Sequence, residues 1–133
     1  MTVVVGFIPT PTGKAALAAA AVEAQHRQVD LVVVNSSRGD ALNDPGFAQP
    51  DDLEWVRTTL QAVGVHFSIR QEMRGREASD EVLDVVAEVQ ATLCVIGIRR
   101  RSAVGKILLG SNAFRILMHA PCPVLAIKAH ADG

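Results

Sequence analysis

The chain has 133 residues, of which 49% are hydrophobic and 20% charged, and this suits one compact domain over residues 1–133. A formal net charge of −1 at pH 7 excludes the overall positive field that draws proteins to nucleic acid or to membranes. Four phenylalanines, one tryptophan and no tyrosine give little aromatic surface for stacking on exposed bases.

The cysteines and the N-terminus indicate the compartment. Cys94 and Cys122 lack the spacing of a metal site or a dithiol motif, and Cys94 lies in an apolar run where it is expected to be buried. The N-terminus has no basic n-region, and the alanine-rich stretch 15–22 is shorter than the roughly 20 residues of a membrane span. We therefore expect a cytoplasmic protein with reduced thiols and no membrane anchor.

The N-terminal half alternates between strand and helix patterns. The apolar run 3–8 predicts a strand covered on both faces, and residues 14–26, rich in alanine, predict a helix. A second buried strand is expected at 31–34, followed by a loop at 35–49 that carries glycine, asparagine, aspartate and proline. Pro-Asp-Asp opens a further helix over 50–63, with acidic residues in its first turn where the helix dipole favours them.

The C-terminal half continues the alternation. Apolar and polar residues alternate over 65–69, which predicts a half-exposed edge strand, and valines at helical spacing predict a helix over 78–90. Apolar runs predict strands over 93–98 and 124–127, and the segment 111–119 between them predicts a helix. The spacing places Phe114, Leu117 and Met118 on one side of this last helix, and Phe114 and Met118 are expected to be core.

The resulting βαβαβαβαβ order predicts an α/β fold, a doubly wound parallel sheet of five strands with helices on both faces. Ligands of such sheets bind beyond the carboxyl ends of the strands, where the strand order reverses. If the order is 3-2-1-4-5, this place lies between the first and fourth strands, beside the loops 7–13 and 98–110.

One of these loops is unusually basic. The segment 97–111 reads Gly-Ile-Arg-Arg-Arg-Ser-Ala-Val-Gly-Lys-Ile-Leu-Leu-Gly-Ser. Backbone N–H groups at a helix start attract anions, and arginines bind phosphate through paired hydrogen bonds. The same residues also fit a solvated loop with Ser111 as an ordinary helix cap. The spacing matches neither a P-loop nor a Gly-x-Gly-x-x-Gly motif, so the residues alone leave both interpretations open.

Several segments of the chain match one known pattern. They are Val-Ile-Gly at 95–97, Leu-Leu-Gly-Ser at 108–111, His-Ala-Pro-Cys-Pro-Val-Leu at 119–125 and the predicted strands at 3–7 and 31–34. The first three look like the C-terminal signature of the universal stress protein family, and the two strands resemble its N-terminal half. The resemblance covers essentially the whole chain and implies a sheet of order 3-2-1-4-5. It also implies a homodimer joined through the last strand. The residues concerned are Val124, Leu125, Ala126, Ile127 and Lys128.

Many members of this family bind ATP through the pattern Gly-x2-Gly-x9-Gly-Ser/Thr. Gly97 matches the first glycine and Gly110 with Ser111 the last pair, whereas Arg100 stands at the second glycine. ATP-binding members also place an aspartate at the end of the first strand, where this chain has Ile8. The resemblance implies a site for ATP, ADP or AMP, with or without magnesium. The implied nucleotide-binding residues are Gly6, Phe7, Ile8, Ser36, Ile96, Gly97, Arg99, Arg100, Gly110, Ser111 and Asn112.

Two functions fit these residues. The first is a regulatory protein of the stress-response type that binds an adenine nucleotide. The alternative is a nucleotide-free dimeric interaction protein, in which Ile8 and Arg100 have closed or altered the site. Hydroxyls and cations follow the strands but few acidic residues do, so we assign no catalytic residue and no metal ligand, and expect at most slow ATP hydrolysis.

Overall fold

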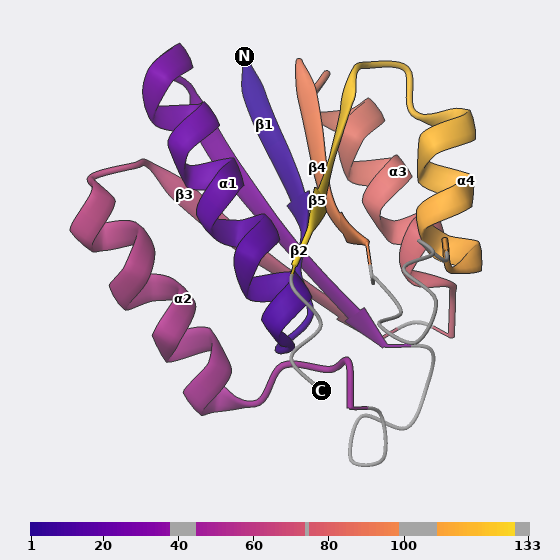
Figure 1. Ribbon diagram of the computed structural model, residues 1–133, viewed down its shortest axis with the longest axis horizontal. Coiled ribbons are helices and arrows are strands. Elements are labelled where there is room, and N and C mark those ends of the chain that lie inside the picture. The colour runs from indigo at the N-terminus through magenta and orange to yellow at the C-terminus, as the bar shows by residue number, and fades with distance from the viewer. Residues whose placement is uncertain (38–44, 74, 99–108, 130–133) are drawn as a thin grey trace.

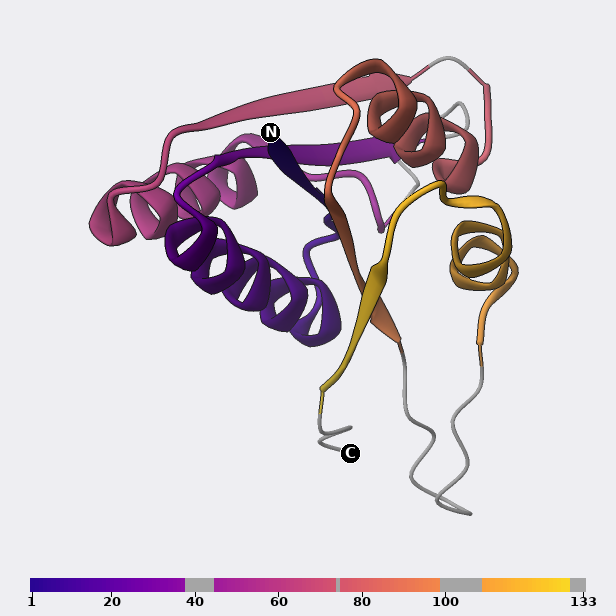
Figure 2. The same ribbon diagram turned by 90° about the horizontal axis from the view of Figure 1, so that it is seen from above.

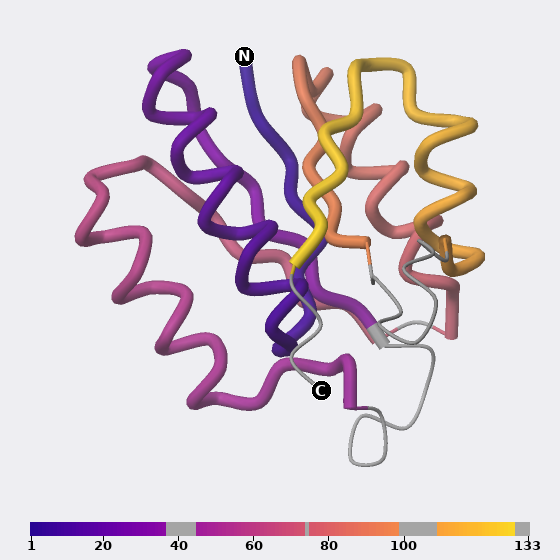
Figure 3. The backbone as a smooth tube through the Cα atoms, viewed as in Figure 1, coloured from indigo at the N-terminus to yellow at the C-terminus, as the bar shows by residue number. Residues whose placement is uncertain are grey.

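The computed structural model describes residues 1–37, 45–73, 75–98 and 109–129. Strands and helices alternate along them (Figure 1). The elements are β1 (Thr2–Gly6), α1 (Pro11–Arg27), β2 (Asp30–Ser37), α2 (Pro50–Val63), β3 (Phe67–Met73), α3 (Ala78–Glu88), β4 (Leu93–Ile98), α4 (Ser111–His119) and β5 (Val124–Lys128). All strand pairs are parallel and the order is β3-β2-β1-β4-β5, which confirms the predicted sheet. Figure 3 shows β1 and β4, which are far apart in the sequence, lying side by side.

Helices cover both faces of the sheet, as predicted. Figures 1 and 2 show α1 and α2 on one face and α3 and α4 on the other. Because successive strand side chains point to opposite faces, Val3 and Val5 pack under α1 and α2, whereas Val4 packs under α3. All three valines are fully buried. The purely apolar strands of the sequence therefore supply two cores, one for each layer of helices.

Helix α1 begins three residues before its predicted start. Thr10 is its N-cap, and the Thr10 hydroxyl accepts a hydrogen bond from the Gly13 N–H (3.1 Å). Pro11 takes the first helical position, where its missing N–H and fixed φ do no harm. The residues that follow the first apolar run therefore form the start of a helix. Strand β1 ends at Gly6, two residues before its predicted end at Ile8.

Strand β2 extends three residues beyond its predicted end. Asn35 is buried in it, and the amide side chain makes hydrogen bonds that an apolar pattern cannot reveal. Its Nδ2 donates to the carbonyl oxygens of Phe7 and Gly46 (both 2.8 Å), and its Oδ1 accepts from the Ala48 N–H (2.9 Å). Gln71 of β3 donates to the same oxygen (3.1 Å). A saturated polar side chain therefore continues the strand into the region predicted as loop.

The bounds of three further elements can be compared with their predictions. Strand β3 is an edge strand, as predicted, but it runs from Phe67 to Met73 instead of over 65–69. The helix predicted over 78–90 ends at Glu88, while α4 has the predicted bounds. Among the described residues, no helix is both long and apolar enough to cross a membrane.

The prediction that Phe114 and Met118 of α4 belong to the core is wrong, and Leu117 on the same side is also exposed. Phe114, Leu117 and Met118 are 54%, 37% and 62% exposed, respectively. The buried face of α4 carries Ile116 and, partly buried, Ala113. The helix lies at one end of its layer and packs on α3 and β4 through this narrow face, so the remaining apolar side chains stay outside the core.

Candidate functional site

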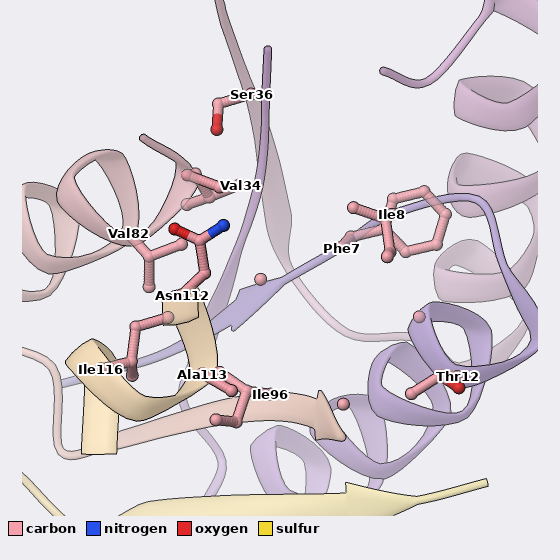
Figure 4. Close-up of a pocket in the computed structure, with 14 residues that line it drawn as sticks. Phe7, Ile8, Thr12, Val34, Ser36, Val82, Ile96, Asn112, Ala113 and Ile116 are labelled. Carbon is pink, nitrogen blue, oxygen red and sulfur yellow. The ribbon is translucent and has the colours of Figure 1, made fainter. Parts of the chain in front are cut away.

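A pocket of about 160 Å³ lies at the carboxyl ends of β1 and β4, the place where the strand order reverses (Figure 4). Seven residues of the site predicted from the sequence line it. They are Gly6, Phe7, Ile8, Ser36, Ile96, Gly97 and Asn112. Gly110 and Ser111, at the start of α4, are exposed and do not line it. Arg99 and Arg100 lie outside the described residues.

Half of the lining comes from residues that sequence reasoning did not name as site residues. These are Thr12, Gly13, Val34, Ala78, Val82, Ala113 and Ile116. Thr12 and Gly13 could have been predicted as lining residues, because the loop after the first strand was expected to lie at the site. Ala78 and Val82 belong to α3, whose apolar spacing indicated core contacts only. Their position becomes clear once α3 is seen to lean over the end of β2 (Figure 4).

The pocket is mostly apolar. None of the described residues that line it carries a charged side chain. The Phe7 ring is buried and stacks on Trp55 of α2, with ring centroids 6.2 Å apart, and the Lys14 ammonium lies 5.0 Å from the Trp55 ring centroid. The stacking on Trp55 restricts the position of the Phe7 ring. A planar, weakly polar group would therefore meet a rigid apolar lining.

The first turns of three helices border the pocket: α1 at Thr12, α3 at Ala78 and α4 at Asn112. The start of α1 is capped by Thr10, as described above. At α3, the Ser79 N–H donates to Oδ1 of Asn112 (3.0 Å), so α4 caps α3. Among the residues that the structure describes, no side chain caps α4 itself, whose N-cap is Gly110. The uncapped N–H groups and the positive dipole end of α4 make it the helix start best suited to an anion.

The two glycines of the predicted motif differ in what surrounds them. A Cβ atom on Gly97 would lie 2.6 Å from Thr12 Cγ2 and 2.8 Å from the Thr12 carbonyl oxygen. Gly97 is therefore required for the close approach of β4 to α1. A Cβ on Gly110 would meet no described atom within 4 Å, and the φ angle of Gly110 is −66°, which any residue adopts. Nothing in the described part of the chain requires a glycine at position 110.

The thiols do not offer a nucleophile. Burial raises the pKa of the Cys94 thiol to about 12, and the neighbouring Cys122 adds to that shift. Burial also raises the pKa of Cys122, which is only partly buried. Both groups are therefore protonated at neutral pH and poorly reactive. Among the described residues, no group of three or more His, Cys, Asp or Glu side chains is arranged to hold a metal ion.

Comparison with known proteins assigns the chain to a family. The family model for the universal stress protein family matches residues 1–128. The chain belongs to this family. A universal stress protein from Mycolicibacterium smegmatis is 44% identical over 128 residues, which cover 96% of this chain and 98% of that relative.

Two solved universal stress protein structures from Archaeoglobus fulgidus also match the fold. One is 32% identical with a TM-score of 0.81, and the comparison covers 96% of this chain and 98% of that one. The other, a complex with dAMP, is 27% identical with a TM-score of 0.71 over the same shares of the two chains. The universal stress protein fold is therefore retained over nearly the whole chain.

Proposed function

We propose that the pocket between β1 and β4 binds an adenine nucleotide. The observation that supports this most strongly is an apolar pocket bordered by the uncapped start of α4. Such a pocket suits a ligand with a flat, weakly charged part and an anionic part. The universal stress protein solved with dAMP has the same overall fold as this chain. Binding in this pocket would give the chain a regulatory role that responds to nucleotide.

The two ends of the ligand would meet different residues. Val34, Val82 and Ile116 offer apolar contact to a base. A phosphate would approach the N–H groups at the start of α4, where Gly110 leaves open space on the side that a Cβ would occupy. The described part of the fold does not require a glycine at position 110. The lack of a side chain there fits the close approach of a ligand to the backbone.

Two departures from the family's ATP-binding pattern shape the proposal. Ile8 lines the pocket with an apolar side chain that is 42% exposed, so no carboxylate is present there to accept hydrogen bonds from a nucleoside. Arg100 replaces a glycine of the motif and lies outside the described residues. Its guanidinium would supply the positive charge that the described lining lacks. ATP, ADP and AMP therefore remain alternative ligands, and magnesium would accompany the longer phosphates.

Calorimetric titration of the nucleotide-free protein with AMP, ADP and ATP, with and without magnesium, tests the proposal. We expect saturable binding at submillimolar concentration for at least one of them. Gly110→Ala should weaken it, because the new Cβ enters the space left for phosphate. Ser68→Ala, at an exposed position of β3, serves as the control. Absence of heat with all three nucleotides in the wild type would refute the proposal.

The exposed apolar side chain of Ile8 favours a second function, that of an interaction protein without nucleotide. Mass spectrometry of gently denatured protein separates the two functions. A co-purified adenine nucleotide supports the first. Its absence, together with negative titrations, supports the second.

We also propose a homodimer joined through β5. This strand is an edge of the sheet, so one row of its backbone groups has no strand partner among the described elements. Val124, Leu125, Ala126 and Ile127 are half-buried and Lys128 is exposed. Light scattering after size exclusion should give about twice the chain mass of 14.1 kDa. A monomer mass at every concentration up to the millimolar range would contradict the dimer.

A further inference from the structure

Helix α3 forms ion pairs with three other segments of the chain. Its acidic side chains meet arginines of β3, of the turn before α3 and of α4. The pairs among the described residues are Arg70 with Glu88, Arg76 with both Glu81 and Asp84, and Arg115 with Asp80. Ion pairs between exposed side chains contribute little to stability. The pair of Arg76 with Glu81 is different, because it involves a buried carboxylate.

Glu81 is 1% exposed and is the single buried charged residue in the part of the chain that the structure describes. Its Oε1 lies 3.5 Å from Nη1 of Arg76, and the same nitrogen contacts the exposed carboxylate of Asp84. A charge in the interior is costly unless opposite charges or hydrogen bonds compensate it, so removing one partner is more damaging than losing a surface pair. The Arg76–Glu81 pair therefore restrains the backbone around Glu81 more strongly than the surface pairs restrain theirs.

The backbone restrained in this way is a wall of the pocket. Ala78 and Val82 lie three residues before and one residue after Glu81, and they are the described residues of α3 that line the pocket (Figure 4). Glu88, which pairs with Arg70, is the last residue of α3 and lies about 9 Å further along the helix axis than Val82. Among these pairs, the buried one is thus at the pocket end of the helix and the Arg70 pair is at the far end.

We propose that Arg76 is a positioning residue of the pocket, which fixes the first turn of α3 through its pair with Glu81. Arg76 is not among the described residues that line the pocket, so it acts on a ligand only through the wall at Ala78 and Val82. A wall that is fixed before the ligand arrives loses little conformational entropy on binding, and such preorganisation raises affinity. The effect on affinity rests on the proposed function, whereas the restraint of the turn does not.

Arg70→Ala provides a matched control, because it removes an arginine that pairs with the far end of the same helix. Amide hydrogen exchange of the unliganded protein and calorimetric titration with AMP are compared for the wild type, Arg76→Ala, Arg76→Lys and this control. In Arg76→Ala the amides of Glu81 and Val82 should exchange about tenfold faster relative to that of Val4 in β1, and the dissociation constant for AMP should rise about fivefold. Arg76→Lys keeps the charge and should recover most of both losses. Arg70→Ala should match the wild type at these two amides and in AMP affinity.

The outcomes separate this inference from the proposed function. If Arg76→Ala binds AMP like the wild type, or if Arg70→Ala weakens AMP binding equally, the positioning role is overturned while nucleotide binding stands. If the wild type binds no adenine nucleotide, the proposed function fails, and hydrogen exchange still decides whether Arg76 fixes the turn. Faster exchange confined to Glu81 and Val82 supports that restraint, whereas exchange that is unchanged or uniformly faster overturns it. Should Arg76→Ala not fold, Glu81→Gln removes the charge of the buried partner with little change of shape and gives the same readouts.

Discussion

Replacing Gly97 by alanine should destabilise the fold more than replacing Gly110, although both residues match glycines of the family's nucleotide-binding pattern. The added Cβ would lie 2.6 Å from Thr12 Cγ2 and 2.8 Å from the Thr12 carbonyl oxygen. The methyl group can turn away, but the carbonyl belongs to the first turn of α1 and moves only with the helix. Relief therefore requires α1 to shift away from β4 by a few tenths of an ångström.

Overpacking of this kind costs about 2 kcal/mol, which for a chain of this length lowers the melting temperature by roughly 8 °C. Gly13→Ala should be worse, because its Cβ would lie 1.8 Å from the Ile8 carbonyl oxygen. Gly110→Ala has open space around the new Cβ and should cost less than about 1 kcal/mol, the ordinary penalty for alanine at an N-cap.

Thermal and urea unfolding of the purified variants, monitored by circular dichroism, provides the assay. The expected order of stability is wild type, Gly110→Ala, Gly97→Ala, then Gly13→Ala. Equal stability of Gly97→Ala and the wild type would refute the close contact of β4 with α1. A loss at Gly110→Ala as large as that at Gly97→Ala would refute the claim that the fold does not need a glycine at position 110.

Three further outcomes are expected. Asn112→Ala should lower the free energy of unfolding in urea by about 1 kcal/mol, because the Ser79 N–H loses its acceptor; an unchanged midpoint would count against this cap. At pH 8, iodoacetamide should modify Cys122 well before Cys94, whose pKa of about 12 keeps the thiol protonated. Peptide mass mapping measures the labelling of each cysteine, and equal labelling would contradict the prediction. Ile8→Asp should strengthen AMP binding several-fold in calorimetry, since a carboxylate accepts nucleoside hydrogen bonds; unchanged affinity would contradict it.

Apolar runs were sufficient to predict the sheet. Four of the five strands contain short apolar runs dominated by Val, Leu and Ile, as strands of a parallel sheet do, and the edge strand β3 begins with an alternating pattern. Their boundaries were harder to predict, because polar contacts decide them. Asn35 extends β2 through hydrogen bonds to Phe7, Gly46 and Ala48, which are distant in the sequence. No local pattern contains that information.

The packing side of α4 could not be predicted for a different reason. Helical spacing shows that Phe114, Leu117 and Met118 share a side, but it does not say whether that side faces the sheet. The protein buries Ile116 instead, because α4 lies at the end of its layer beside α3. Only the tertiary arrangement distinguishes the two faces.

The location of the candidate pocket could be predicted from the sequence, but only half of the residues that line it could. The reversal of strand order placed it between β1 and β4, and the family pattern led to Gly97, Gly110 and Ser111. Spacing alone could not show that Gly97 serves the packing of α1 on β4. It also could not show that Val82 of α3 lines the pocket, since that contact joins distant parts of the chain.

Titration of AMP into the isotopically labelled protein, followed by amide chemical shifts, tests most directly whether the pocket binds an adenine nucleotide. If the pocket binds the nucleotide, saturable shifts are expected at Gly6, Gly97 and Asn112, which line it. Gly64 and His66, near the opposite ends of the strands, should not move. The absence of saturable shifts at millimolar AMP, or shifts centred on Gly64 and His66 instead, would contradict it.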